Sequence, residues 1–89
     1  MDKSFLSVAI IVVNYNGYQD TAECIQSLSR IEYEEYEVIV VDNCSTDNSY
    51  ENLQMLQDSE QFVLLKSDEN RGFSAGNNIG IRYVWRVMI

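Results

Sequence analysis

Three short apolar runs constrain the fold of this chain more than any other feature. The runs Val8–Val13, Glu37–Val41 and Phe62–Leu65 are rich in β-branched and other apolar residues. Such runs are typical of strands that are buried on both faces of a parallel sheet. The segments after each run have helical spacing of apolar residues. The order strand, helix, strand, helix, strand, helix therefore predicts an α/β fold, with a parallel sheet and right-handed crossovers.

The helical segments carry local signals for where helices begin. Asp20 and Glu23 have the spacing of a capping box, which predicts a first helix to about Arg30. Small polar residues after the second run are expected to cap a second helix that ends near Gln57. A third helix is expected to begin near Ser74 and to continue into the apolar last residues of the sequence. The candidate caps of the second helix are Ser45, Thr46 and Asp47, and the third helix should include Tyr83, Val84 and Trp85.

The length and composition predict a small globular unit. The chain has 89 residues, of which 46% are hydrophobic, a composition that excludes a disordered chain. A parallel sheet needs cover on both faces, and three strands with three helices do not complete that cover. We therefore expect residues 1–89 to be a single partial domain, the first part of a larger one, unless the chain pairs with itself through the uncovered sheet.

The charge and the cysteines exclude several classes of function. A net charge of −8 argues against nucleic-acid binding, which needs a basic face, and disfavours docking on anionic membranes. The run Val8–Val13 is too short to span a membrane, so no membrane segment is expected in this chain. With no histidine, Cys24 and Cys44 do not form a zinc pattern. We place Cys24 at a buried helix position and Cys44 in a loop, in a reducing, cytoplasmic setting.

Polar residues follow all three runs. The first run ends in Asn14-Tyr15-Asn16-Gly17, the second in Asp42-Asn43, and the third leads into residues 70–77. The carboxyl ends of parallel strands lie at one edge of a sheet, which is where open α/β sheets bind ligands. We therefore expect these three polar segments to line one crevice.

Two charged residues of this crevice have alternative interpretations. Asp42 can accept hydrogen bonds from a ligand, or it can close an Asx-turn and cap the next helix. We favour the ligand-binding interpretation, because Asp42 follows a long apolar strand and is expected to lie beside two other polar strand ends. Arg71 can pair with a phosphate or a base carbonyl, or it can form a surface ion pair with Asp68 or Glu69.

The uncharged candidates also have two interpretations each. Gly72 and Gly76 let a backbone approach a ligand closely, or they simply permit tight turns. Tyr15 can stack on a flat ring or lie half-buried. Asn77, a weak helix former at the start of the third helix, either caps that helix or contacts a ligand.

Several known motifs are absent from the sequence. There is no G-x-G-x-x-G after the first run and no P-loop, so neither phosphate-binding fingerprint is present. Without histidine there is no Ser-His-Asp or Cys-His device. No D-x-D and no calcium-loop spacing occur, so the sequence offers no metal ligands and no catalytic residues.

Three segments in order, VAIIVVNYN, VIVVDNCSTDNS and NRGFSAGNNIGI, resemble the N-terminal half of family 2 glycosyltransferases, in particular the rhamnosyltransferase-like branch that builds surface polysaccharides. The resemblance covers residues Ser7 to Ile81. It implies a GT-A nucleotide-binding fold. It also implies transfer of a sugar from a nucleotide-diphosphate sugar to an acceptor hydroxyl, with Mg²⁺ or Mn²⁺ as cofactor.

The resemblance also implies roles for individual residues. Asn14, Tyr15 and Asn16 match the loop beside the nucleoside, and Asp42, followed by Asn43, matches the aspartate that hydrogen-bonds the base. In the third motif, Arg71 matches the basic residue near the base and the diphosphate. The residues that match the part shaping the floor of the pocket are Gly72, Gly76 and Asn77.

One part of the family pattern is missing. The family's D-x-D motif, which holds the metal and the diphosphate, is expected on a fourth strand beyond residue 89. The sequence therefore predicts a glycosyltransferase fragment that binds nucleotide-sugar but does not catalyse transfer alone. The alternative is a non-catalytic α/β module that self-associates or binds nucleotides.

Overall fold

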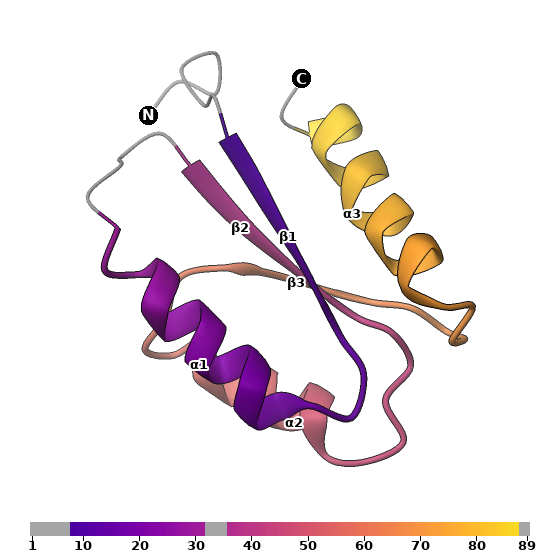
Figure 1. Ribbon diagram of the computed structural model, residues 1–89, viewed down its shortest axis with the longest axis horizontal. Helices are drawn as coiled ribbons and strands as arrows, with labels where there is room; N and C mark the ends of the chain where they lie inside the picture. Colours follow the sequence, from indigo (N-terminus) through magenta and orange to yellow (C-terminus); the bar gives the residue numbers. More distant parts are fainter. Residues whose placement is uncertain (1–7, 32–35, 88–89) are drawn as a thin grey trace.

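The computed structural model describes residues 8–31 and 36–87, which form three strands and three helices (Figure 1). The strands and helices alternate along the chain, as the sequence predicts. In order they are β1 (Val8–Asn14), α1 (Tyr18–Leu28), β2 (Tyr36–Asp42), α2 (Ser49–Leu56), β3 (Val63–Lys66) and α3 (Phe73–Val87).

The three strands form one parallel sheet in the order β1-β2-β3. β1 and β2 pair over seven residues, from Val8 opposite Tyr36 to Asn14 opposite Asp42. β3 is shorter and pairs only with the second half of β2, from Ile39 onward. The prediction of an α/β fold with a parallel sheet is therefore confirmed, and β2 is its most buried strand.

Helices α1 and α2 cover one face of the sheet, and α3 covers the other (Figure 1). Alternate residues of a strand point to opposite faces. On the first face, Val38 and Val40 of β2 pack with Ile25 of α1 and Leu53 of α2, together with Phe62. This cluster of buried aliphatic and aromatic side chains is the hydrophobic core.

Helix α3 approaches the sheet through glycines instead of large side chains. A Cβ atom on Gly80 would lie 2.7 Å from Ile11 Cγ2, and one on Gly76 would lie 2.8 Å from Val13 Cγ1. Gly76 and Gly80 are the buried residues of this helix. The large side chain of Trp85 on the same helix is 65% exposed.

The predicted start of the first helix is wrong. The first helix begins at Tyr18, with Gly17 as its N-cap and no side-chain capping bond, so Asp20 and Glu23 do not form a capping box. The backbone N–H of Thr21 already donates to the carbonyl oxygen of Gly17 at 3.0 Å. The first helical turn is therefore complete without them, because the N-cap Gly17 lies three residues before Asp20.

The predicted burial of Cys24 is also wrong, since its side chain is exposed. The buried stripe of α1 runs through Thr21, Ala22 and Ile25, and Cys24 lies outside it. The second helix begins at Ser49 with Asn48 as its N-cap, later than the three residues proposed as caps. No helix in the described ranges is long and apolar enough to cross a membrane.

Candidate functional site

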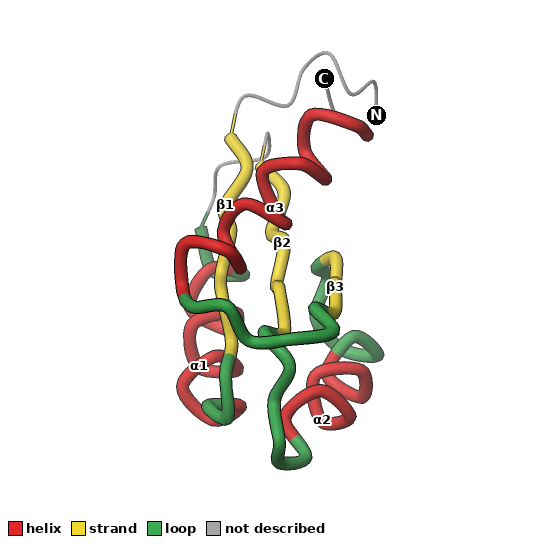
Figure 2. Tube along the Cα trace, turned by 90° about the vertical axis from the view of Figure 1, so that its right-hand side faces the viewer, coloured by secondary structure: helices red, strands yellow, loops and turns green. Residues whose placement is uncertain are grey.

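All three strands end at the same edge of the sheet, where three loops follow them (Figure 2). We call residues 15–17, 43–48 and 67–72 the first, second and third exit loops. The backbone N–H of Asn43 donates to the carbonyl oxygen of Asn14 at 2.8 Å, and that of Ser67 donates to the carbonyl oxygen of Asp42 at 2.8 Å. The polar strand ends therefore converge, as the sequence predicts.

Asn14 and Asp42 form a buried polar pair at the tips of β1 and β2. Asn14 Nδ2 donates to Asp42 Oδ1 at 2.8 Å, and Thr21 Oγ1 donates to Asn14 Oδ1 at 2.7 Å. The two residues are 2% and 0% exposed. Buried polar groups of this kind need partners, and this pair finds them within the protein.

The carboxylate of Asp42 also binds the second exit loop. Its Oδ1 accepts from Ser45 Oγ at 2.7 Å, and its Oδ2 accepts from the backbone N–H of Ser45 at 3.1 Å. Both oxygens are thus engaged by protein donors. This geometry corresponds to the loop-closing interpretation of Asp42, and direct contact between Asp42 and a ligand stays a prediction.

Asn16 ties the first exit loop to the second. Its backbone has φ +50°, in the left-handed region that asparagine tolerates better than most residues. Its Oδ1 accepts from the backbone N–H groups of Thr46 at 2.8 Å and Asp47 at 3.2 Å, and its Nδ2 donates to Thr46 Oγ1 at 3.0 Å. The neighbouring Tyr15 is 46% exposed, so its ring is open to a ligand.

Asn43 connects the second exit loop to the third. Its Nδ2 donates to Asn70 Oδ1 and to the carbonyl oxygen of Gly72, both at 3.0 Å. The residue is 3% exposed, and its Oδ1 is buried without a hydrogen-bond partner among the described residues. An unpartnered acceptor of this kind is unusual, because buried polar atoms generally have a hydrogen-bond partner.

The third exit loop is the most open part of the site. Arg71 Nη2 pairs with Glu69 Oε1 at 2.8 Å, and both side chains are largely exposed. Gly72 has φ +96°, which side chains rarely adopt, and Asn77 Nδ2 donates to the carbonyl oxygen of Phe73 at 3.2 Å. A cavity of about 450 Å³ lies beside this loop, and Arg71, Asn78 and Arg82 are among its lining residues.

The pKa of the Asp47 carboxyl lies below its ordinary value of 3.8. The causes are interaction with the Ser49 side chain and a hydrogen bond from the Ser49 backbone N–H. The backbone bond, at 2.8 Å to Oδ1, is the one whose geometry the structure shows. Asp47 therefore stays ionised at the start of α2, where negative charge is favourable.

Sequence reasoning missed three residues of this network as site residues. Ser45 and Thr46 were considered only as helix caps, and Thr21 was not considered at all. The available signal was the adjacent serine and threonine three and four residues after the strand-end Asp42. Their partners lie about thirty positions away in the first exit loop, and only the paired strands bring them together.

The residues described here do not suit a metal ion. No group of three or more histidine, cysteine, aspartate or glutamate side chains in residues 8–31 and 36–87 is arranged to hold one. The best-placed carboxylate, that of Asp42, has both oxygens occupied by protein donors.

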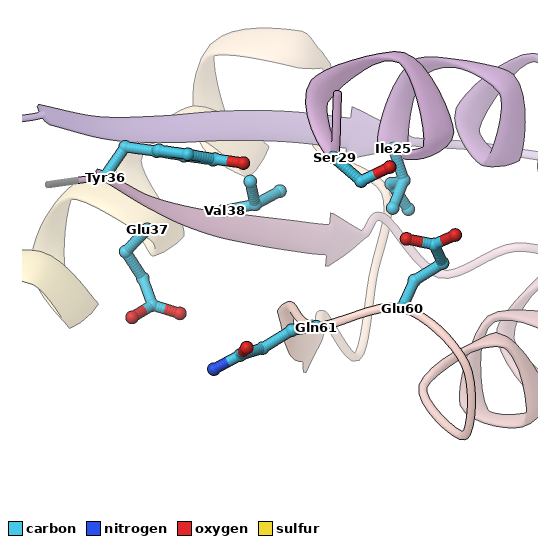
Figure 3. Close-up of a pocket in the computed structure, with 7 residues that line it drawn as sticks. All are labelled: Ile25, Ser29, Tyr36, Glu37, Val38, Glu60 and Gln61. Atoms are coloured by element: carbon cyan, nitrogen blue, oxygen red, sulfur yellow. The ribbon is translucent and has the colours of Figure 1, made fainter. Parts of the chain in front are cut away.

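A separate cavity of about 340 Å³ lies beside the first residues of β2, at the end of the sheet opposite the exit loops (Figure 3). None of the predicted site residues lines it, so it is not part of the candidate site. Its lining residues are Ile25, Ser29, Tyr36, Glu37, Val38, Glu60 and Gln61.

Comparison with known sequences gives consistent matches. The family model described as "Glycosyl transferase family 2" matches residues 9–85. Glycosyltransferase GlyG from Streptococcus pneumoniae is 36% identical over 77 residues, which are 83% of this chain and 25% of that protein. Poly-beta-1,6-N-acetyl-D-glucosamine synthase from Staphylococcus aureus is 24% identical over 75 residues, 84% of this chain and 18% of that protein. The chain thus spans a quarter or less of these relatives.

Solved structures show the same fold. The mannosyltransferase PcManGT from Pyrobaculum calidifontis, in complex with GDP-Man and Mn²⁺, matches with a TM-score of 0.80 at 25% identity, over 92% of this chain and 26% of that one. Residues 1–349 of TarS from S. aureus match with a TM-score of 0.73 at 25% identity, over 85% of this chain and 23% of that one.

Proposed function

Because the chain belongs to glycosyl transferase family 2, we propose that it supplies the nucleoside part of a nucleotide-sugar site in a longer sugar transferase. One observation carries the proposal: the exposed residue Tyr15 lies on the first exit loop, which is hydrogen-bonded to the second exit loop through Asn16. An exposed aromatic ring on a fixed loop is suited to stack on the flat face of a nucleobase.

The individual roles follow from this geometry. The Tyr15 ring stacks on the base, and Asn43 holds the third exit loop against the second through its bonds to Asn70 and Gly72. Asp42 acts indirectly, because its carboxylate holds Asn14 and the second exit loop in place. Arg71 leaves its exposed pair with Glu69, which is worth little in water, and turns to the diphosphate. The remaining contacts of the proposed site are Asn16, Gly72, Gly76 and Asn77.

The whole protein is proposed to transfer a sugar from a nucleotide-diphosphate sugar to an acceptor hydroxyl in surface polysaccharide synthesis. The name of the S. aureus synthase and the GDP-Man bound to PcManGT support this class of substrate. The Mn²⁺ of that complex supports a divalent cofactor for the whole protein. The narrower rhamnosyltransferase-like assignment stays a prediction. Both cysteines are free, which supports a reducing, cytoplasmic setting.

Calorimetry with UDP, GDP and dTDP tests the nucleoside site directly. We expect weak binding of at least one nucleotide. We also expect Tyr15→Ala to reduce the affinity by about 3- to 10-fold, the range expected for one aromatic stack. Trp85→Ala is the matched control, because it removes an aromatic ring that is also exposed but lies on α3. The proposal fails if no nucleotide binds, or if the two variants lose the same affinity.

The chain alone is expected to lack transferase activity. It offers no metal-binding group in the described residues, and positioning of an acceptor needs surfaces that it does not provide. Incubation with a panel of nucleotide-sugars and manganese checks this point. Turnover at the rate of a full-length relative would overturn it.

A second candidate function is a non-catalytic module that self-associates. In the described residues β1 pairs only with β2, and α3 exposes Ile81 and Trp85 next to the glycines that face the sheet. Open strand edges and exposed apolar side chains promote association. Sedimentation velocity decides: a dimer that Ile81→Glu with Trp85→Glu dissociates supports this candidate, and a strict monomer excludes it.

A further inference from the structure

The hydroxyl of Ser45 lies where the first and second exit loops meet. It donates to Asp42 Oδ1 at 2.7 Å, and it accepts from Asn14 Nδ2 at 3.3 Å and from the backbone N–H of Asn16 at 3.0 Å. A serine hydroxyl has one donor and two acceptor positions. All three are in use, so this one atom joins both strand tips and the first exit loop.

These bonds hold the chain on both sides of Tyr15. Asn14 is buried and fixed by Thr21, Asp42 and Ser45. Asn16 is held in its left-handed conformation by Ser45 and by Thr46. The backbone before and after Tyr15 is therefore fixed, while Tyr15 itself remains 46% exposed.

We propose that Ser45 is a positioning residue: its hydroxyl locks the first exit loop onto the second and so presents the Tyr15 ring, preorganised, to a nucleobase. This inference rests on the proposed function for the identity of the ligand. A rigid site binds more tightly than a mobile one because less conformational freedom is lost on binding. Ser45 itself does not touch the ligand, and it acts through Asn16 and Tyr15.

Replacing Ser45 by alanine removes this lock without dismantling the site. Asp42 keeps its bonds to Asn14 Nδ2 and to the backbone N–H of residue 45. Asn16 keeps its side-chain bonds to Thr46, and its freed N–H lies in an exposed region where water can replace the hydroxyl. The fold is therefore expected to persist, with greater motion of the first exit loop.

Amide hydrogen exchange, followed by NMR, tests the lock in the absence of any ligand. In Ser45→Ala we expect exchange at the Asn16 amide to be about tenfold faster or more, while exchange at Val40 in the core is unchanged, since local openings differ across a structure. Ser67→Ala is the matched control, because its hydroxyl bonds only within the third exit loop. Unchanged exchange at Asn16 would overturn the inference.

Nucleotide affinity then tests whether the lock acts through Tyr15. By calorimetry with UDP, GDP and dTDP, Ser45→Ala should weaken binding by about 3- to 10-fold, and Ser45→Thr, which retains a hydroxyl, should restore most of it. In a Tyr15→Ala background the same change should cost less than about twofold, because residues that act as a unit are not additive. Fully additive effects would show that Ser45 does not act through Tyr15.

The two measurements separate this inference from the proposed function. If the wild-type chain binds no nucleotide, the proposed function fails, and the claim that Ser45 positions Tyr15 for a nucleobase fails with it. The exchange data then still decide whether Ser45 locks the two loops. If nucleotides bind and Ser45→Ala binds them as the wild type does, only the positioning role is overturned.

Discussion

The first two exit loops and the third exit loop follow similar strands, yet they are held in different ways. The first two are joined through buried side chains, with Asn14 and Asp42 at 2% and 0% exposure. The third is held mainly by exposed local contacts, such as the pair between Arg71 and Glu69. Its main side-chain link to the rest of the site comes from Asn43.

The side chain at each strand tip explains the difference. Asn14 and Asp42 lie opposite each other at the ends of β1 and β2, and their short polar side chains hydrogen-bond to each other. Lys66 at the end of β3 also lies opposite Asp42, but it is exposed, and its ammonium lies 4.7 Å from the centre of the Tyr50 ring. A polar side chain at a strand tip is thus buried where a short polar side chain on the neighbouring tip bonds to it. The long, charged side chain of Lys66 extends into solvent instead.

The largest expected effect comes from disrupting the buried hydrogen bonds that join the first two exit loops. Asp42→Ala leaves the donors of Asn14 and Ser45 without their carboxylate, and unsatisfied buried donors cost about 1–3 kcal/mol each. We expect the free energy of unfolding in urea to fall by about 3 kcal/mol in total. Asp68→Ala, which removes an exposed carboxylate from the third exit loop, should change it by less than about 0.5 kcal/mol. Equal losses in both variants would contradict the comparison.

The next effect concerns the contact between α3 and the sheet. Gly76→Ala places a methyl group 2.8 Å from Val13 Cγ1, and such overpacking costs about 1–3 kcal/mol. Urea unfolding should show a loss of about 2 kcal/mol. In a Val13→Ala background the same substitution should cost much less. If the cost is the same in both backgrounds, close packing is not the reason for glycine at this position.

A small effect is expected from the exposed ion pair of the third exit loop. Arg71→Ala should change the free energy of unfolding by less than about 0.5 kcal/mol, because exposed pairs contribute little. Its effect on nucleotide affinity should be larger than its effect on stability, if the guanidinium turns to the diphosphate. Denaturation and calorimetry on the same variant measure both quantities. A marked loss of stability would show that the third loop is structurally rigid.

The smallest effect is a pH dependence at Asp47. Its folded-state pKa is lowered, so the stability that it contributes is present above its ordinary value of 3.8 and is lost as the pH falls through the lower folded value. Asp47→Asn keeps an acceptor for the Ser49 N–H but removes the charge. Thermal unfolding should therefore show a slight advantage of the wild type at neutral pH, which disappears in acid once the pH has fallen through the lowered folded-state pKa. An advantage that persists in acid would contradict this assignment.

The sequence predicted the element order and the meeting of the strand ends, because both depend on local patterns. The apolar runs locate β1, β2 and β3 to within a residue or so at most ends. The errors fall where a helix boundary or phase depends on tertiary contacts, as at the first turn of α1 and at Cys24. The hydrogen bond from Asn16 to Thr46 was not predictable, because no local pattern links residues that are thirty positions apart.

The amino-acid sequence by itself determined the alternation of strands and helices, the parallel sheet and the polar character of one sheet edge. These follow from the spacing of apolar residues and from the turn-forming residues between them. Only the tertiary structure decided which polar residues are buried supports and which stay exposed. Burial depends on the partners that folding brings to each polar side chain, so Asp42, bonded to Asn14 and Ser45, lies inside the network, whereas Tyr15 and Arg71 face solvent.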